Sequence, residues 1–323
     1  MHSEKDQILY PAIEPYDIGV LHAGHGHDIY YEQCGNRNGV PILFVHGGPG
    51  AGCDADDRRY FDPKWRVILF DQRGSGRSKP FDSLQANTTW ALASDIWDLR
   101  RKLGINRCVL FGGSWGSTLS LVYSILYPGT VSGMVLRGIF LGGKDEIDYY
   151  LGGQTSLFFS EAWQRFVSHV PEKHQKNPAP YYLTQLKSSD PEVRRKYAYE
   201  WAYYELSMLH LNQRAPEEIN AEINSFSFES LALMEAHFLS QNCFLEDSYI
   251  LNNCNVIASI PVSIIQGRYD AICPMISAHR LHKRLPGSTL WVTQAGHSCS
   301  DIENMKRLID ETNAMFRRLA SKR

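Results

Sequence analysis

The 323-residue sequence predicts an α/β fold in which a mostly parallel sheet is flanked by helices. Short apolar runs recur along the chain and end in glycine-rich or charged loops. Near-continuous apolar strands of this length are typical of a sheet that is buried on both faces. Helical patterns separate the runs, and this alternation of strand and helix favours parallel pairing.

Six apolar runs are the expected strands. The first four are residues 40–45, 65–70, 107–111 and 134–140, and the last two are residues 260–265 and 289–293. Helices are expected over residues 90–103 and 117–127. A closing helix is expected at the end of the chain, where apolar residues recur at helical spacing; they are Ile302, Met305, Leu308, Ile309, Phe316 and Leu319.

Residues 141–256 interrupt this pattern. They contain no clear buried-strand run, and prolines separate several helical stretches. The segment has 9 basic and 16 acidic residues, a net charge of −7, and 18 of the 38 aromatic residues. We predict a helical cap over 141–256, inserted into a core formed by 1–140 and 257–323. Such a cap suits a cationic ligand with an apolar ring; alternatively, the acids are a solvated surface and the aromatic residues the interior of the cap.

The composition bounds the class of protein. At 43 % hydrophobic and 21 % charged residues it is typical of a soluble globular protein. A net charge of −2 offers no basic footprint for nucleic acid. No apolar run reaches the roughly 18 residues of a membrane span, and the polar N-terminus is unlike a secretory signal. Seven scattered cysteines argue against disulfides and zinc. We expect a cytoplasmic protein that has no cofactor and no metal.

Ser114 lies in the most informative motif of the chain. The motif is Gly-x-Ser-x-Gly over residues 112–116, and it follows an expected strand and precedes an expected helix. A serine on so sharp a turn holds its hydroxyl clear of the sheet, and the flanking glycines allow the tight backbone. Because a serine hydroxyl is a poor nucleophile alone, it needs a base and an orienting carboxylate.

Asp270 and His297 are the expected partners of Ser114. Each follows one of the last two expected strands, so both can meet Ser114 at the carboxyl edge of the sheet. The chain order of nucleophile, acid and base is that of the α/β-hydrolase fold. We predict that His297 accepts the Ser114 proton, while Asp270 fixes the imidazole tautomer and stabilises its charged form.

The expected oxyanion hole comes from two backbone N–H groups. Trp115, the residue after the nucleophile, supplies one, and Gly47 or Gly48 in the His-Gly-Gly-Pro-Gly loop supplies the other. His46 is interpreted as structural. The loop of residues 71–78 resembles a phosphate loop but lacks its Gly-Lys-Ser/Thr ending, so we expect it to brace the site.

Taken together, the motifs at residues 46–50, 71–78, 112–117, 267–270 and 296–297 closely resemble those of the prolyl iminopeptidases. These are serine exopeptidases of the α/β-hydrolase fold that release N-terminal proline from peptides. The resemblance covers nearly the whole chain. It implies a prolyl aminopeptidase that acts on short peptides with an N-terminal proline, binds no nucleic acid or membrane, and uses the α/β-hydrolase fold.

The resemblance also implies substrate-binding residues. The family binds the free amine with cap glutamates, which match Glu205, in a Trp-Ala-Tyr-Tyr-Glu element, and Glu235. Tyr204 stands in that element where a Trp is more usual. The proline ring of the substrate packs on a Phe in an Arg-Gly-Ile-Phe element, which matches Arg137 to Phe140, and Cys273 matches a pocket-lining position.

One segment departs from the family pattern. After residue 140 the family often carries basic residues, whereas this chain reads Leu-Gly-Gly-Lys-Asp-Glu-Ile, which affects the entrance to the cap. Two other functions are compatible with the motifs. One is a small-acyl esterase or amidase, which would prefer uncharged esters; the other is a non-catalytic binding protein, which would not react with a fluorophosphonate.

Overall fold

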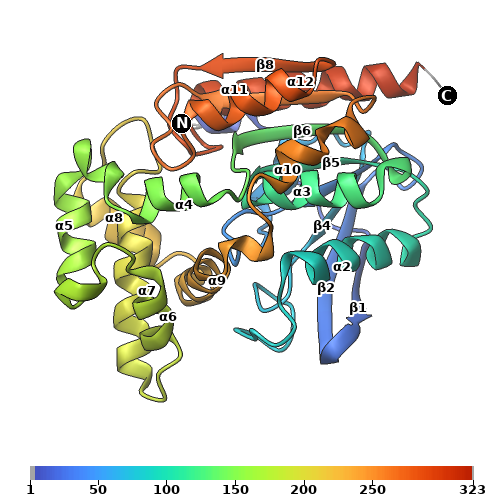
Figure 1. The fold of residues 1–323 in the computed structure, drawn as a ribbon. Coiled ribbons are helices and arrows are strands. Elements are labelled where there is room, and N and C mark those ends of the chain that lie inside the picture. Colours follow the sequence, from blue (N-terminus) through green and yellow to red (C-terminus); the bar gives the residue numbers. More distant parts are fainter. Residues whose placement is uncertain (1–3, 322–323) are drawn as a thin grey trace.

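The computed structural model describes residues 4–321, and an eight-stranded sheet forms the centre of this part (Figure 1). The strands are β1 (Asp17–Ala23), β2 (His27–Gly35), β3 (Pro41–Val45), β4 (Arg66–Phe70), β5 (Cys108–Ser114), β6 (Val131–Ile139), β7 (Val262–Gly267) and β8 (Ser288–Thr293). Their order across the sheet is β1-β2-β4-β3-β5-β6-β7-β8. The β1–β2 and β2–β4 pairs are antiparallel, and all other neighbours are parallel.

The predicted α/β class is therefore confirmed, and the six predicted strands correspond to β3 to β8. The hairpin of β1 and β2 was not among the expected strands. It forms the antiparallel edge of the sheet, and its strand β2 contacts the loop at residues 71–78 through hydrogen bonds such as that from the Tyr30 backbone N–H to the Ser78 hydroxyl.

The apolar strands are covered on both faces. On β4, Val67 and Leu69 point into one hydrophobic cluster, whereas Ile68 and Phe70 point into the other. Helices α2 (Thr89–Lys102), α3 (Trp115–Leu126) and α11 (Met275–Arg284) cover one face, and the closing helix α12 (Ile302–Ala320) covers the other with the short α1 (Glu4–Ile8) beside it. Side chains alternate along a strand, so a strand buried on both faces shows a continuous apolar run.

The segment between β6 and β7 is helical, and we keep the name cap for it. Its helices are α4 (Lys144–Leu151), α5 (Ser160–Ser168), α6 (Ala179–Leu186), α7 (Pro191–Leu206), α8 (Pro216–Ile223), α9 (Phe228–Ser240) and α10 (Tyr249–Asn253). Figure 1 shows most of them gathered on one side of the sheet, while α10 returns to α3. None of the helices in the described range 4–321 is long and apolar enough to cross a membrane.

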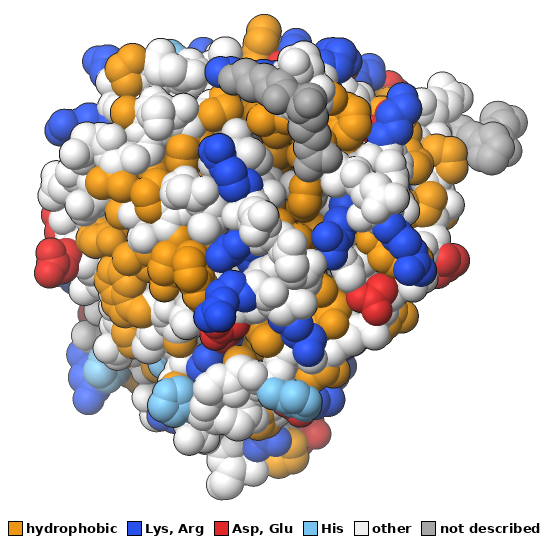
Figure 2. All heavy atoms as spheres, turned by 90° about the vertical axis from the view of Figure 1, so that its right-hand side faces the viewer, with side chains coloured by type: hydrophobic (Ala, Val, Ile, Leu, Met, Phe, Trp, Pro, Cys, Tyr) orange, Lys and Arg blue, Asp and Glu red, His pale blue; other side chains and the backbone are white. Residues whose placement is uncertain are grey.

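Aromatic side chains form the interior of the cap. The Phe166 ring stacks between Tyr182 and Tyr204, with both centroid distances at 4.4 Å, and Trp201 meets the Phe166 ring edge-on at 5.6 Å. These aromatic residues are therefore the hydrophobic interior of the cap and not a binding surface for an apolar ring, which is the second interpretation given for them in the sequence analysis. The face turned away from most of the cap carries more Lys and Arg than Asp and Glu (Figure 2), so the acidic charge of the chain is concentrated elsewhere.

Candidate active site

Ser114 is the last residue of β5, and α3 begins at the next residue. Its backbone has φ 56° and ψ −125°, a conformation that L-residues rarely adopt. The turn requires small neighbours, because a Cβ on Gly116 would collide with the Val45 carbonyl and a Cβ on Gly112 with Gly116. The local structure is therefore the sharp strand-to-helix turn that the motif predicts.

His297 and Asp270 lie beside each other in the loops that follow β8 and β7. The Nδ1 atom of His297 is 2.9 Å and 3.0 Å from the two carboxylate oxygens of Asp270. A carboxylate only accepts, so Nδ1 carries the hydrogen and Nε2 keeps a lone pair for a substrate or a hydroxyl. Both side chains are buried. This is the geometry of an imidazole held in one tautomer by an acid.

Further contacts hold Asp270 and His297 in place. One Asp270 oxygen accepts the backbone N–H groups of Ile272 (3.1 Å) and Cys273 (2.7 Å). The other accepts the Nε2 amide of Gln266 at 3.0 Å. The Arg137 guanidinium donates to the His297 carbonyl. We did not predict a role for Gln266 from the sequence. Its position at the end of β7, four residues before Asp270, could have indicated a contact with that carboxylate.

A cavity of about 730 Å³ joins the loops at the carboxyl edge of the sheet to the cap. Of the residues proposed from the sequence, it brings six together; they are Gly47, Gly48, Ser114, Arg137, Glu205 and His297. Phe140, Tyr204, Glu235 and Cys273 are not among its lining residues, nor are Trp115 and Asp270. A larger cavity of about 950 Å³ lies between the loop at residues 81–84 and α6, α7 and α9, away from these residues.

The loop that follows β3 approaches Ser114 through Gly47. A Cβ placed on Gly47 would lie 3.6 Å from the Ser114 Cβ, whereas one on Gly48 would meet residues 50, 51 and 231. The backbone of Gly47 is thus the nearer of the two to the nucleophile. Gly48 has φ 100°, which explains why a glycine is needed there.

Gln72 connects this loop to the residue after the nucleophile. Its backbone N–H donates to Nε2 of His46 and its side-chain amide to the His46 carbonyl, both at 2.9 Å. Its Oε1 accepts the indole N–H of Trp115 at 2.9 Å. Burial lowers the pKa of His46, so the imidazole stays a neutral acceptor. The loop at 71–78 therefore braces the site, as predicted, and His46 is structural; the bridging role of Gln72 was not predicted.

The pKa of Cys273 is raised well above its usual value, first by burial and then by Asp270 and Glu146. The thiol therefore stays protonated and neutral, and the backbone N–H of Cys273 donates to Asp270.

Tyr204 and Phe140 lie away from the cavity. The Tyr204 hydroxyl contacts the Thr155 hydroxyl and donates to the Tyr150 carbonyl, both at 2.6 Å. The Phe140 backbone contacts the side chains of Ser117 and Thr118, and its ring is partly buried. The position of Tyr204 therefore supports a packing role in place of the substrate contact that was predicted for it.

Glu205 and Glu235 form a buried pair next to the cavity. Their carboxyl groups hydrogen-bond to each other, and Glu235 accepts the indole N–H of Trp201 at 2.5 Å. Burial, followed by the charge of Glu205, raises the pKa of Glu235 well above its usual value. Burial also raises the pKa of Glu205, against the opposing effects of Glu235 and His297. We infer that Glu235 keeps a proton and that Glu205 carries the single negative charge of the pair.

Among the described residues, no N–H group or hydroxyl donates to the Glu205 carboxylate, and Glu235 is the acid that contacts it. The Oε2 atom of Glu205 is buried, and Glu205 is the member of the pair that lines the cavity. A carboxylate with so few partners favours a cationic donor that comes from outside the chain.

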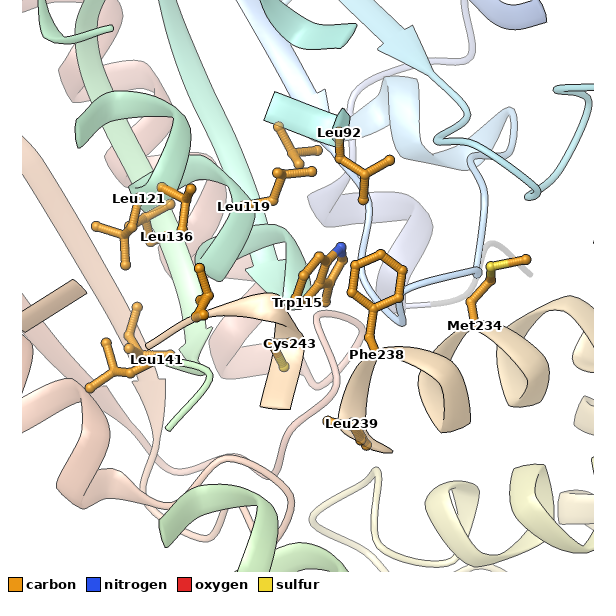
Figure 3. Close-up of a cluster of buried hydrophobic side chains, with 14 of the residues drawn as sticks. Leu92, Trp115, Leu119, Leu121, Leu136, Leu141, Met234, Phe238, Leu239 and Cys243 are labelled. Atoms are coloured by element: carbon orange, nitrogen blue, oxygen red, sulfur yellow. The ribbon is translucent and has the colours of Figure 1, made fainter. Parts of the chain in front are cut away.

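The cap also contacts the nucleophile turn directly. The Phe238 ring of α9 meets the Trp115 indole at 4.8 Å, with an angle of 60° between the rings. Figure 3 shows the two rings side by side, Trp115 on α3 and Phe238 on the cap helix. Both side chains are fully buried, so the position of α9 is tied to the turn that carries Ser114.

Comparison with known proteins identifies the family. The model of the alpha/beta hydrolase fold family matches residues 40–301. A probable proline iminopeptidase from Leptolyngbya boryana is 45 % identical over 308 residues, which cover 94 % of this chain and 96 % of that protein. The chain belongs to the proline iminopeptidase family. A proline iminopeptidase from Arabidopsis thaliana is 41 % identical over 91 % of this chain and 78 % of the relative.

Other proline iminopeptidases and solved structures agree. The proline iminopeptidase from Xylella fastidiosa strain Temecula1 is 39 % identical over 95 % of this chain and 99 % of its own length. Among solved structures, a proline iminopeptidase-related protein from Thermus thermophilus has a TM-score of 0.62 at 20 % identity, covering 93 % of this chain and 98 % of its own. At that identity the structural likeness supports the fold, which is the one expected of a proline iminopeptidase.

Proposed function

We propose that this protein is a serine exopeptidase that releases N-terminal proline from short peptides through an acyl-enzyme on Ser114. The observation that carries the proposal is the partly buried carboxylate of Glu205, which accepts no hydrogen bond from an N–H group or hydroxyl of the described residues and lines the same cavity as Ser114 and His297. Its relatives named proline iminopeptidase support the same substrate. No cofactor takes part in the reaction.

In the acylation step, Nε2 of His297 accepts the Ser114 proton as Oγ attacks the carbonyl carbon of the first residue. The charge that develops on the carbonyl oxygen is stabilised by the N–H groups of Trp115 and Gly47; Gly47 is preferred because it lies nearer Ser114. The imidazolium, stabilised by Asp270, then gives its proton to the leaving nitrogen as the C–N bond breaks. The shortened peptide leaves with a new N-terminus.

Deacylation repeats these roles with water as the nucleophile. His297 accepts a proton from water as the oxygen attacks the ester carbonyl, and then returns this proton to Ser114 as the C–O bond breaks. The first residue leaves as a free amino acid, and the enzyme is restored without any change in oxidation state.

Specificity for an N-terminal residue follows from the charge of the glutamate pair. A pair that shares one proton has one negative charge, which matches the single positive charge of a prolyl amine. The interaction is strong because Glu235 is buried and Glu205 is partly buried, so that little water screens the charge. A blocked or internal proline has no such charge and would leave Glu205 unpaired. In this proposal Glu205 contacts the amine directly, and Glu235 sets its charge from behind.

The cap of residues 141–256 is part of the proposal as the unit that recognises the substrate N-terminus. A cytoplasmic location is also proposed, because all seven cysteines are free thiols, as a reducing compartment favours. Fractionation of the source cells, with an antibody against this chain, tests the location.

The decisive experiment is a panel of aminoacyl naphthylamides that differ only in the first residue, each with a free or acetylated N-terminus. We expect proline with a free amine to be the best substrate and the acetylated form to be cleaved at least about 100-fold less efficiently, since an unpaired buried charge costs several kcal/mol. Ser114→Ala is the matched control and should abolish turnover. Equal cleavage of free and acetylated substrates would contradict the proposal and favour an esterase or amidase.

A further inference from the structure

The connection between α7 and α8 of the cap touches the loop that carries the catalytic histidine. The backbone N–H of Ser298 donates to the Leu209 carbonyl at 2.8 Å. The backbone N–H of Leu211 donates to Oδ2 of Asp301 at 3.1 Å, and Nδ1 of His210 lies 3.0 Å from Oδ1 of the same residue. Three successive cap residues are thus fastened to the loop that follows His297.

The Asp301 carboxylate links the cap segment at residues 209–211 to the loop that carries His297. Its Oδ2 also accepts the backbone N–H of Gly296 at 2.7 Å, so one carboxylate holds the residue before His297 as well as the cap. The contact is close, because a Cβ on Gly296 would lie 2.7 Å from the backbone nitrogen of Leu211. Asp301 directly precedes α12, which places the carboxylate on a rigid element.

Charge strengthens this contact. The His210 and Asp301 side chains are only 9 % and 12 % exposed. Burial disfavours the imidazolium, but Asp301 and Glu222 outweigh it and raise the pKa of His210, against an opposing effect of Arg214. The pKa of Asp301 is lowered, since His210 and two backbone N–H groups outweigh its burial. Nε2 of His210 lies 3.7 Å from Glu222, too far for a hydrogen bond but close enough for attraction between charges.

The same cap segment is joined to the amine site. Glu205 lies in the last turn of α7, four residues before Leu209. Leu209 and Glu222 line the cavity on the cap side, and His297 and Ser298 line it on the other. A change in the contact at Asp301 therefore alters the distance between Glu205, which binds the amine, and His297, which is the base for Ser114.

We propose that Asp301 and His210 are positioning residues that hold Glu205 at a fixed distance from His297, so that binding of the substrate amine places the scissile carbonyl at Ser114, next to the base. This rests on the proposed function of Glu205. Asp270 and Arg137 hold His297 independently of the cap. Loss of the contact therefore weakens the use of the amine and leaves the reactivity of Ser114 intact.

The kinetic test compares proline naphthylamide with the naphthylamide of cyclopentanecarboxylic acid, which has the same ring size and no amine. The ratio of their kcat/KM values measures the amine preference. We expect Asp301→Asn and His210→Ala to lower this ratio about tenfold, equivalent to about 1.4 kcal/mol. In His210→Ala, which leaves the contact between Asp301 and Gly296 in place, the rate at which a fluorophosphonate labels Ser114 should stay within about twofold of the wild-type rate.

Two further variants make the test specific. His210→Asn keeps an N–H donor near the position of Nδ1 and should restore most of the amine preference. His169→Ala removes another cap histidine, which lies 3.5 Å from Glu200, and should leave the preference unchanged. An unchanged preference in Asp301→Asn and His210→Ala would overturn the proposal. A parallel fall in fluorophosphonate labelling of His210→Ala would also overturn it, because the contact would then act on the catalytic base itself.

Hydrogen exchange gives a readout that needs no substrate. Amides of residues 209–211 and 296–301 should exchange faster in His210→Ala than in the wild type, while α12 and the sheet stay protected. Unchanged exchange would contradict the contact itself. A wild-type enzyme that shows no amine preference, together with faster exchange in His210→Ala, would place the failure in the proposed function of Glu205 and not in this contact.

Discussion

Glu205 shows how a buried acid can remain charged next to another acid. Its neighbour Glu235 has a pKa raised well above the usual value, because it is buried and faces the charge of Glu205. The Trp201 indole N–H donates to Oε2 of Glu235 at 2.5 Å. The result is a single negative charge directed at the cavity, which a pair of independent surface glutamates would not produce.

The first prediction concerns the pH dependence of substrate binding. Because the pKa of Glu205 is raised, the amine-binding carboxylate is lost as the pH falls through that value, starting above the usual range of a glutamate. KM for proline naphthylamide should therefore rise on acidification. Glu205→Gln should raise KM at least about tenfold at neutral pH, since a hydrogen bond to a charged group is worth about 1.5–3 kcal/mol, and should flatten the pH profile.

The control for this prediction is Glu200→Gln. Glu200 lies on the same helix but pairs with Arg165 at 2.7 Å, outside the cavity. Its substitution should leave KM and the pH profile as in the wild type. An unchanged KM in Glu205→Gln, measured from steady-state kinetics across the pH range, would show that Glu205 does not bind the amine.

At the scale of elements, α9 is the cap helix that contacts the nucleophile turn. Phe238 meets Trp115 at the first residue of α3, and the packing in Figure 3 extends from there to leucines of α3 and β6. Since interiors are close-packed, this contact transmits the position of the cap to the turn.

The second prediction follows from that contact. Phe238→Ala should destabilise the protein by about 3–5 kcal/mol, the usual cost of removing a buried phenylalanine ring. Phe158, another cap phenylalanine, is 80 % exposed, so Phe158→Ala should change stability by less than about 0.5 kcal/mol. Urea denaturation followed by tryptophan fluorescence measures both values; similar effects of the two variants would contradict a packed interface.

The unpredicted hairpin shows a limit of reasoning from apolar runs. Strand β1 lies at the sheet edge, and Ile18 and Val20 on its outer side are 58 % and 40 % exposed. Such a strand has no continuous apolar run, because one of its faces contacts solvent. The predicted strands β3 to β7 lie inside the sheet, where both faces are covered, whereas β8 is the other edge strand and was found from its apolar run although Trp291 and Val292 are 38 % and 41 % exposed. The short Gly-His-Gly connection at residues 24–26 was a usable sign of the β1–β2 pairing.

At the scale of the whole molecule, Glu146 fastens the point where the chain leaves the sheet for the cap. Its carboxylate accepts the backbone N–H groups of Leu141 (2.9 Å) and Gly143 (3.0 Å) and contacts the Ser277 hydroxyl of α11. Burial raises its pKa, and these hydrogen bonds oppose the rise. The cap entrance, where the sequence departs from the family pattern, is therefore tied to the helix that follows Asp270.

The third prediction tests this junction. Glu146→Leu leaves two buried N–H groups and one hydroxyl without partners, and it should cost about 2–5 kcal/mol of stability. The neighbouring Asp145 forms an exposed ion pair with Arg280, so Asp145→Asn should cost at most about 1 kcal/mol. Thermal unfolding of both variants provides the measurement. A Glu146→Leu variant as stable as Asp145→Asn would show that the junction does not depend on this carboxylate.

The residues of the candidate site that directly follow a strand could be predicted from the sequence. Ser114, Asp270 and His297 each follow a strand, and parallel strands bring their carboxyl ends to one edge. Gln72 and Asp301 were not predictable, because their partners His46 and His210 come from other loops, and for Asp301 the partner is 91 residues away. Which member of the glutamate pair keeps the proton was also hidden, since it depends on the burial of the two carboxyl groups and on their contact with each other.

The positive φ of Ser114 implies a conflict between stability and activity in this enzyme. A serine held at φ 56° is strained, and glycine adopts such a conformation at much lower cost. Ser114→Gly should therefore raise the free energy of unfolding by about 1 kcal/mol while it abolishes turnover, whereas Ser114→Ala keeps the strain and should leave stability nearly unchanged. Urea denaturation of the two variants tests this; equal stability would show that the turn is relaxed. Selection for thermal stability alone would then tend to replace the residue on which the chemistry depends.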